Sequence, residues 1–217
     1  MTDEARTVGH DHYLRWIERG LSSEDEIVVG SFLPAGFDRY IKLLHPGQVY
    51  ENGVLRDITW HEIGEISGGE VTSSTKIGDL LGESSQADSV ALPPGGVMPD
   101  ATCQRLTRFL DGLTSDRGTC FFAFHGSWAA FLPPVGPLGR HHFLGQEMVL
   151  IAAEVTDACD FSVSGTLWWP EDRLWLVATP LDYYFSLVGC SVAVASALLD
   201  EPGLETFVVS WDQGASL

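Results

Sequence analysis

Apolar residues spaced three and four positions apart predict helices in four stretches of the chain. In residues 10–21, Tyr13, Trp16, Ile17 and Leu21 share one helical face. The other three stretches also combine an apolar stripe with capping or breaking residues. They are 57–66, with Asp57 or Thr59 as cap and Trp60, Ile63 and Ile66 inward; 100–113, capped by Asp100, with Cys103, Leu106, Phe109, Leu110 and Leu113 inward; and 191–203, capped by Ser191.

Runs of β-branched and aromatic residues between turn signals predict strands. The clearest pair is 165–169 and 174–182, joined by the polar turn Pro170–Arg173. Four more runs share this character: 27–34, 119–128, 183–189 and 204–211.

Two further segments fit more than one element. Residues 36–45 carry both a helical stripe and a strand alternation, and we favour the strand because Pro46 and Gly47 end the segment sharply. Residues 143–159 fit a strand or a helix, since periodicity alone does not separate a short apolar run of either kind.

From Ser67 to Pro99 the chain is rich in Gly, Ser and Pro, and only residues 76–82 offer a turn of helix. A connection this long is uncommon inside a compact domain, so we expect a flexible insertion, a lid or a poorly ordered loop. We find no internal repeat. The predicted fold is therefore one α+β domain over residues 1–217, with a mainly antiparallel sheet, packed helices and an insertion at about 67–99.

The N-terminus begins with acids and lacks the basic start and apolar run of a signal peptide, which predicts a cytoplasmic protein. The most apolar stretches, Phe143–Val155 and Phe185–Leu199, are shorter than the roughly 20 residues of a membrane span. We expect no membrane association.

Charge is the most unusual bulk property, with a formal net charge of −18. After Arg140 there are eleven Asp and Glu residues and one basic residue, Arg173. Such a field repels nucleic acid and anionic lipid, whereas it attracts a basic protein partner. The same acids also serve solubility.

No metal or cofactor motif is present. Cys103, Cys120, Cys159 and Cys190 form no C-x-x-C pair and are predicted to be reduced, mostly buried thiols. None of the seven histidines has a zinc-site spacing. Glycine patterns that bind phosphate are also missing, so we expect neither metal nor cofactor.

No catalytic set is predicted either. Ser127 lies two residues after His125, but the G-x-S-x-G elbow of a nucleophilic serine is absent. With thirty acids in the chain, a pair of carboxylates carries no information.

The segment "LWWPEDRLWLVATPLD", residues 167–182, contains three of the seven tryptophans. Trp168 and Trp169 are adjacent on a strand, so they point to opposite faces and cannot line one pocket. We expect them to pack in the core. As candidate binding residues we retain both tryptophans together with neighbouring charged side chains, of which Arg173 is expected to pair with a local carboxylate: Trp168, Trp169, Glu171, Asp172, Arg173 and Asp182.

This segment, with "GFDRYIKLLHP" and "WHEI" upstream, resembles an uncharacterised protein family of high-GC Gram-positive bacteria. In that pattern an Arg follows "WWPED", matched by Arg173, and an Asp follows the "VAT" strand, matched by Asp182. The insertion at 67–99 departs from the pattern. Some members loosely resemble the SUKH class of immunity and adaptor proteins, which implies a cytosolic α+β domain that binds other proteins.

The leading hypothesis is a non-enzymatic, acidic protein-binding module that associates with a basic partner through acids such as Asp157, Asp160, Glu171 and Asp172. The alternative is a small-ligand-binding protein or hydrolase-like enzyme, with a pocket under residues 67–99 and Arg173 or His125 as polar contacts. A homo-oligomer is a third possibility, because apolar strands can be exposed.

Overall fold

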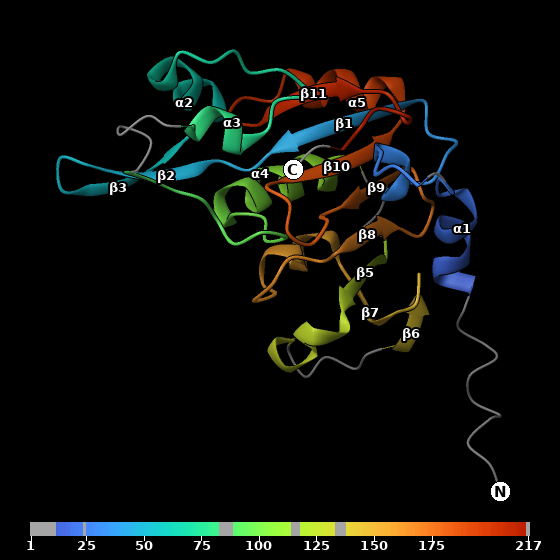
Figure 1. Cartoon of the computed structure of the whole chain (residues 1–217). Helices are drawn as coiled ribbons and strands as arrows, with labels where there is room; N and C mark the ends of the chain where they lie inside the picture. The colour runs from blue at the N-terminus through green and yellow to red at the C-terminus, as the bar shows by residue number, and fades with distance from the viewer. Residues whose placement is uncertain (1–11, 24, 83–88, 114–117, 133–137, 216–217) are drawn as a thin grey trace, which may run out of the picture.

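The protein is an α+β fold built on an eight-stranded antiparallel sheet (Figure 1). The computed structural model describes residues 12–23, 25–82, 89–113, 118–132 and 138–215. The strand order is β11-β1-β10-β9-β8-β5-β7-β6. These strands are β1 (Arg39–Leu44), β5 (Cys120–His125), β6 (Gly139–Phe143), β7 (Gln146–Ala153), β8 (Leu167–Pro170), β9 (Trp175–Ala178), β10 (Phe185–Cys190) and β11 (Glu205–Val209).

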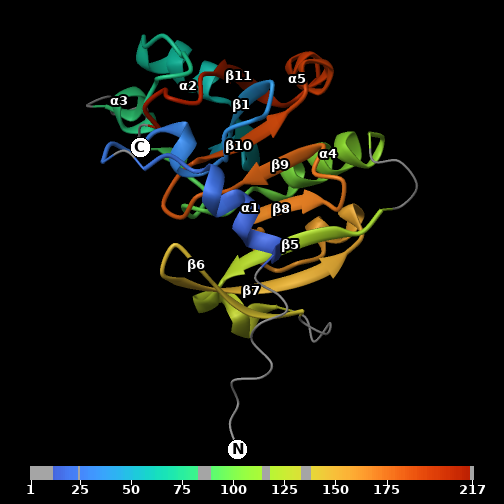
Figure 2. The same cartoon turned by 90° about the vertical axis from the view of Figure 1, so that its right-hand side faces the viewer.

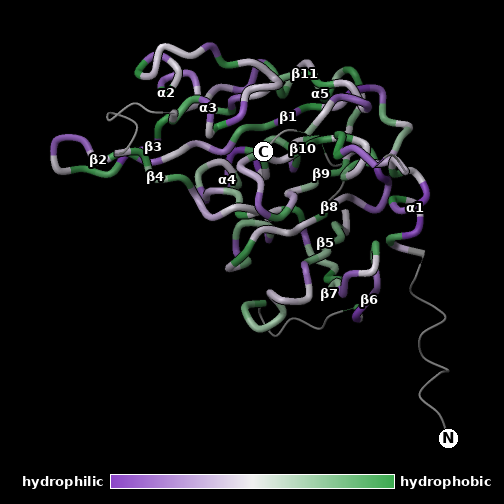
Figure 3. The backbone as a smooth tube through the Cα atoms, viewed as in Figure 1, coloured by the Kyte–Doolittle hydropathy of each residue, from purple (hydrophilic) through white to green (hydrophobic). Residues whose placement is uncertain are grey.

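A second, three-stranded sheet projects from the body of the molecule (Figure 1). It contains β2 (Gly47–Glu51), β3 (Val54–Ile58) and β4 (Val90–Ala91). Asn52 and Gly53 connect β2 to β3, and both have positive φ, 52° and 82°. Two such residues give the turn that matches the twist of a hairpin. The tip of the hairpin is hydrophilic, in contrast to the hydrophobic strand β10 (Figure 3).

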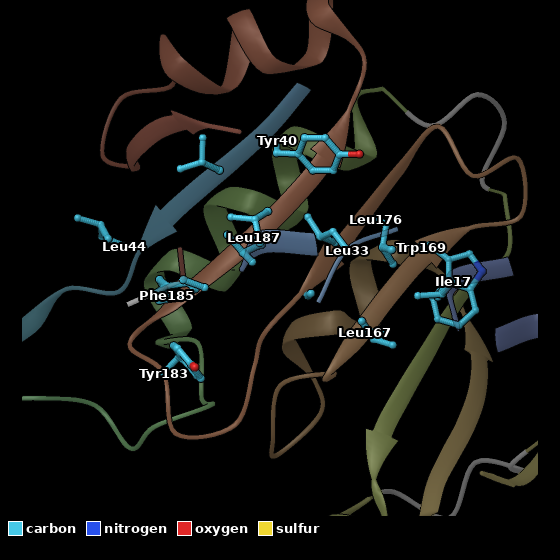
Figure 4. Close-up of a cluster of buried hydrophobic side chains, with 14 of the residues drawn as sticks. Ile17, Leu33, Tyr40, Leu44, Leu167, Trp169, Leu176, Tyr183, Phe185 and Leu187 are labelled. Atoms are coloured by element: carbon cyan, nitrogen blue, oxygen red, sulfur yellow. The ribbon is translucent and has the colours of Figure 1, made fainter. Parts of the chain in front are cut away.

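Helices cover both faces of the large sheet (Figure 2). One face packs against α1 (His12–Gly20), α2 (Trp60–Ser67) and α3 (Ile77–Leu81), and Figure 4 shows side chains of this cluster, among them Ile17, Leu33 and Trp169. The other face packs against α4 (Asp100–Asp111), α5 (Val192–Leu199) and the 3₁₀ helix η5 (Val155–Cys159). The inner strands β1, β5, β8, β9 and β10 are therefore buried on both sides.

Several sequence expectations are confirmed. Ser191 caps α5 by accepting a hydrogen bond from the backbone N–H of Val194 (3.3 Å). Thr59, rather than Asp57, caps α2. Residues 39–44 form strand β1. In residues 143–159, whose sequence fits both a strand and a helix, residues 146–153 form strand β7.

The predicted strand at 27–34 is wrong. Only Val28 makes an isolated bridge, to Gly214, and Val29–Ser31 form a 3₁₀ helix, η2. The backbone N–H of Gly30 donates to the carbonyl of Trp211, so this segment pairs with the C-terminal loop instead of a strand. A Cβ at Gly30 would lie 2.5 Å from the indole of Trp211, which requires glycine there.

Three smaller expectations also fail. Ile66 is exposed in the last turn of α2, and Leu113 is exposed because α4 ends before it, at Asp111. Asp100 is the first residue of α4 and does not cap it, since Pro99 takes the cap position.

In the 67–99 segment, the described residues include α3 and β4. Ile77 and Leu80 are buried in the core on the α2 side of the sheet. Gly95 lies so close to the backbone of Asp182 that a Cβ would be 2.7 Å from its Cα. Residues 77–80 of this segment therefore belong to the core, and Gly95 packs against the loop between β9 and β10.

Candidate functional site

The two adjacent tryptophans of β8 are core residues on opposite faces of the sheet, as the strand alternation predicts. Trp169 packs edge-on against Trp16 of α1, with ring centroids 6.2 Å apart. Trp168 stacks on Phe122 at 5.8 Å on the other face. Both are almost fully buried. Neither presents a surface to a ligand.

The turn between β8 and β9 carries three of the charged candidates, Glu171, Asp172 and Arg173, all exposed. The backbone N–H of Glu171 donates to the carbonyl of Thr119, and Asp172 accepts from the N–H of Leu174. The guanidinium of Arg173 lies 4.9 Å from the ring of Trp16. The described ion pairs do not include its expected pair with a local carboxylate, and the described contact of the guanidinium is with this indole.

Asp182 lies at the other end of the sheet, in the loop between β9 and β10. It is exposed and has a φ of 67°. Because β9 runs from the β8–β9 turn to this loop, the turn and the loop lie at opposite ends of β9. The six candidate residues therefore do not converge on one site.

A groove of ≈ 350 Å³ follows β11, the edge strand of the large sheet. Thr59 and His61 form one wall, and Leu199, Gly203 and Leu204 form the other. Strand residues Glu205, Thr206 and Phe207 form the floor between these walls. Within the described residues, no strand pairs with the outer edge of β11. The groove thus runs beside unpaired backbone.

Glu205 and His61 organise the centre of the groove. The Glu205 carboxylate accepts hydrogen bonds from the backbone N–H of Trp60 (2.7 Å) and of His61 (2.9 Å), the free amides at the start of α2. It also bonds Nδ1 of the His61 ring. The imidazole lies parallel to the ring of Phe207, with centroids 5.9 Å apart. These contacts fix the ring on the groove wall.

This arrangement leaves Nε2 of His61 directed away from Glu205, on a side chain that is 60% exposed. A carboxylate-oriented imidazole serves as a hydrogen-bonding group for a ligand or as a general base. In the described part of the groove only the hydroxyls of Thr59 and Thr206 accompany it, and neither is hydrogen-bonded to the ring. The described groove thus presents an exposed imidazole nitrogen and two hydroxyl groups.

Charge around the groove is mainly negative. Asp200 and Glu201 follow α5 immediately before the wall residue Gly203, and Glu205 lies on the floor. Arg105 of α4 approaches from below and donates to the carbonyl of Pro202 (3.0 Å). Among the described residues, Asp200, Glu201 and Glu205 thus accompany Arg105 along this edge, and the ion pair of Arg56 with Glu62 lies beside Thr59.

His125 and Ser127, which the sequence places close together, do interact. Nδ1 of His125 accepts from the backbone N–H of Ser127 (3.3 Å) and is 2.7 Å from its hydroxyl, while Nε2 is 2.6 Å from the side-chain oxygen of Gln146. His125 thereby caps the 3₁₀ helix η4 (Gly126–Phe131). The amide of Gln146 takes the place that a carboxylate has in a catalytic triad.

Three hydrogen-bonded polar side chains are buried just after the C-terminal end of β1. Nε2 of His45 is 2.9 Å from the hydroxyl of Ser186, which is 2.9 Å from that of Thr179, and all three are fully buried. Burial lowers the pKa of His45 to about 3. Lys42, also buried, donates to the carbonyl of Ser73 (3.0 Å), and burial lowers its pKa to about 8.

Across the described ranges, no group of three or more His, Cys, Asp or Glu side chains is arranged to hold a metal ion. In the same residues, no helix has the length and apolar character needed to cross a membrane.

Sequence reasoning missed the groove because its residues come from segments far apart in the chain. The motif Thr59-x-x-Glu62 marks the start of α2, but Glu205 lies 145 positions from Trp60. In comparisons with protein-family models, curated proteins and solved structures, nothing matches this chain.

Proposed function

We propose that the protein is a binding module that takes an extended, basic segment of a partner protein along the edge strand β11. The observation that carries this proposal is the groove itself, which combines unpaired strand backbone with side-chain walls on both sides. Strand addition gains affinity from main-chain hydrogen bonds and specificity from pockets for alternate side chains. The Glu205 and His61 pair provides a fixed polar contact inside such a pocket.

Charge supports a basic occupant. The protein carries a net charge of −18, Glu205 lines the groove, and Asp200 and Glu201 follow the lining residue Leu199 in the chain. A Lys or Arg side chain next to these carboxylates is attracted, and the long-range field increases its rate of encounter. A protein-binding role through the acidic C-terminal third agrees with this location.

An exposed edge strand is normally protected, because unpaired backbone invites pairing with another chain. The four exposed or half-exposed residues Glu205–Val208 carry no proline and no lysine, the usual protective residues. This absence fits an edge that is used for binding.

The test is an array of immobilised random decapeptides probed with the purified protein at low and high salt. We expect the retained peptides to be enriched in Lys and Arg and to be released by salt. Asp200→Lys combined with Glu201→Lys should weaken retention roughly tenfold. Glu171→Lys combined with Asp172→Lys, an exposed double charge reversal at the β8–β9 turn, is the matched control and should retain the same peptides.

Two outcomes would contradict the proposal. Retained peptides without basic enrichment would remove the charge argument. Loss of retention on neutralising Asp157, Asp160, Glu171 and Asp172, with the Asp200 and Glu201 variant unaffected, would place binding at the β8–β9 end of the sheet instead.

N-methylation of alternate backbone nitrogens in a retained peptide should abolish binding if the main chain pairs with β11.

A further inference from the structure

Two of the four cysteines lie against each other on the α4 face of the sheet. The Sγ atom of Cys103, in the first turn of α4, is 2.9 Å from Sγ of Cys159, the last residue of η5. Both are free thiols. A disulfide bond is about 2.05 Å long, so the sulfurs need to approach by less than about 1 Å to bond.

The other two cysteines have no such neighbour. Cys120 is on β5 and Cys190 is on β10, and strands β8 and β9 separate them in the sheet. Both are completely buried, and burial raises the pKa of each thiol. They serve as an internal comparison for the first pair.

The two sulfurs of the pair differ in reactivity. The hydrogen bond with the Cys103 thiol lowers the pKa of Cys159 to about 7, and the hydroxyl of Thr107, 3.3 Å away, acts in the same direction. Burial and the nearby carboxylates of Asp160 and Asp100 oppose this effect. The same thiol hydrogen bond, followed by burial, raises the pKa of Cys103.

The more reactive of the two thiols is also the more exposed one. Cys159 is partly exposed, whereas Cys103 is buried. A thiolate that is partly accessible and next to a second thiol is the arrangement of a reactive cysteine with its resolving partner.

We propose that Cys103 and Cys159 form a reversible disulfide when the protein meets a hydroperoxide. The Cys159 thiolate attacks one peroxide oxygen, an S–O bond forms, and the O–O bond breaks to release hydroxide. The Cys103 sulfur then attacks the Cys159 sulfenic acid, an S–S bond forms, and the departing hydroxide takes the Cys103 proton as water. With hydrogen peroxide, two thiols lose two electrons and the peroxide is reduced to two waters.

The surrounding structure permits this movement and gives it a consequence. A void of ≈ 10 Å³, close to the minimum that admits one water, lies beside Cys103 between Met98, Ala158 and Ser164. It gives the Cys103 sulfur room to shift.

The disulfide would join residues 56 positions apart and link α4 to the connection between β7 and β8. A cross-link of this span constrains the unfolded chain, so Tm should rise by about 5–10 °C.

The experiment treats the full chain with hydrogen peroxide, alkylates the remaining thiols in denaturant and maps them by mass spectrometry. We expect two of the four cysteines to be lost to alkylation and recovered in one cross-linked peptide pair containing Cys103 and Cys159. Dithiothreitol should restore both thiols. The rate of oxidation should rise with pH through about 7, where Cys159 ionises.

Variants separate the two roles. Cys159→Ser should stop peroxide consumption, whereas Cys103→Ser should leave Cys159 as a sulfenic acid that reacts with dimedone. Cys190→Ser is the matched control and should still form the disulfide. Wild-type protein in which Cys159 passes to sulfinic acid while Cys103 stays alkylatable would overturn the proposal, as would cross-links that join two chains or that contain Cys120 or Cys190.

Discussion

The carboxylate of Glu205 lies across the N-terminus of helix α2 and accepts a 2.7 Å hydrogen bond from the backbone N–H of Trp60. This contact joins the last strand of the sheet to a helix 145 positions earlier in the chain. It positions one wall of the groove relative to its floor, and the first prediction follows from it.

Glu205→Gln should destabilise the protein by about 1–3 kcal/mol. The glutamine side chain has only one accepting oxygen, so it cannot accept hydrogen bonds from the N–H groups of both Trp60 and His61 as the two carboxylate oxygens do. The negative charge at the helix N-terminus is also lost. Urea denaturation followed by circular dichroism measures the change. Glu201→Gln is the control and should change stability by less than about 0.5 kcal/mol. Equal effects in the two variants would show that the capping contact is unimportant.

Trp168→Ala and Trp169→Ala should each destabilise the protein by about 3–5 kcal/mol, because each removes a large buried ring from a different face of the sheet. Leu174→Ala, at a side chain that is 52% exposed next to the same turn, should have little effect. Unfolding in urea gives all three values. A tryptophan variant with near wild-type stability would contradict its assignment to the core.

His45 should make stability depend on pH. Its pKa of about 3 in the folded state is below its ordinary value of 6.5, so the unfolded state binds more protons between these values. The contribution of neutral His45 to the free energy of unfolding is therefore fully present above pH 6.5. It decreases as the pH falls, by about 1.4 kcal/mol per pH unit at most. His45→Gln should reduce the slope between pH 6.5 and 4.5 in urea titrations. An unchanged slope would show that another group is responsible.

Lys42→Met should stabilise the protein at pH 7 by about 1–3 kcal/mol. Burial lowers the pKa of this ammonium from 10.5 to about 8. At pH 7 the side chain is therefore charged in the folded protein, at a cost in free energy relative to the solvated ammonium of the unfolded chain. Between pH 8 and 10.5 the unfolded state binds more protons, so wild-type stability should gain with rising pH relative to the variant. The advantage of the variant should therefore shrink by pH 10. A variant less stable than wild type at pH 7 would mean that the bond to Ser73 outweighs burial.

Local signals in the sequence predict local structure well in this protein. Ser191 before an apolar run predicts α5, and the polar turn 170–173 predicts the β8–β9 hairpin, because each depends on residues a few positions apart. The alternation of Trp168 and Trp169 predicts which faces they occupy. Such features depend only on the period of a strand or on a cap.

Long-range contacts decide the rest. The segment 27–34 reads as a strand, but its backbone pairs with residues 211–214, near the other end of the chain. Arg173 has acidic sequence neighbours and lies over Trp16 instead. Glu205 and His61, like Cys103 and Cys159, meet only when the sheet has formed, so no spacing in the sequence reveals either pair.

The most direct measurement of the central claim is backbone amide hydrogen exchange of β11, with and without a basic peptide retained on the array. Binding along the edge strand should slow exchange at residues 205–209 and leave the opposite edge strand, β6, unchanged. Protection elsewhere with none in β11, at a peptide concentration that saturates binding, would show that the groove is not the binding site.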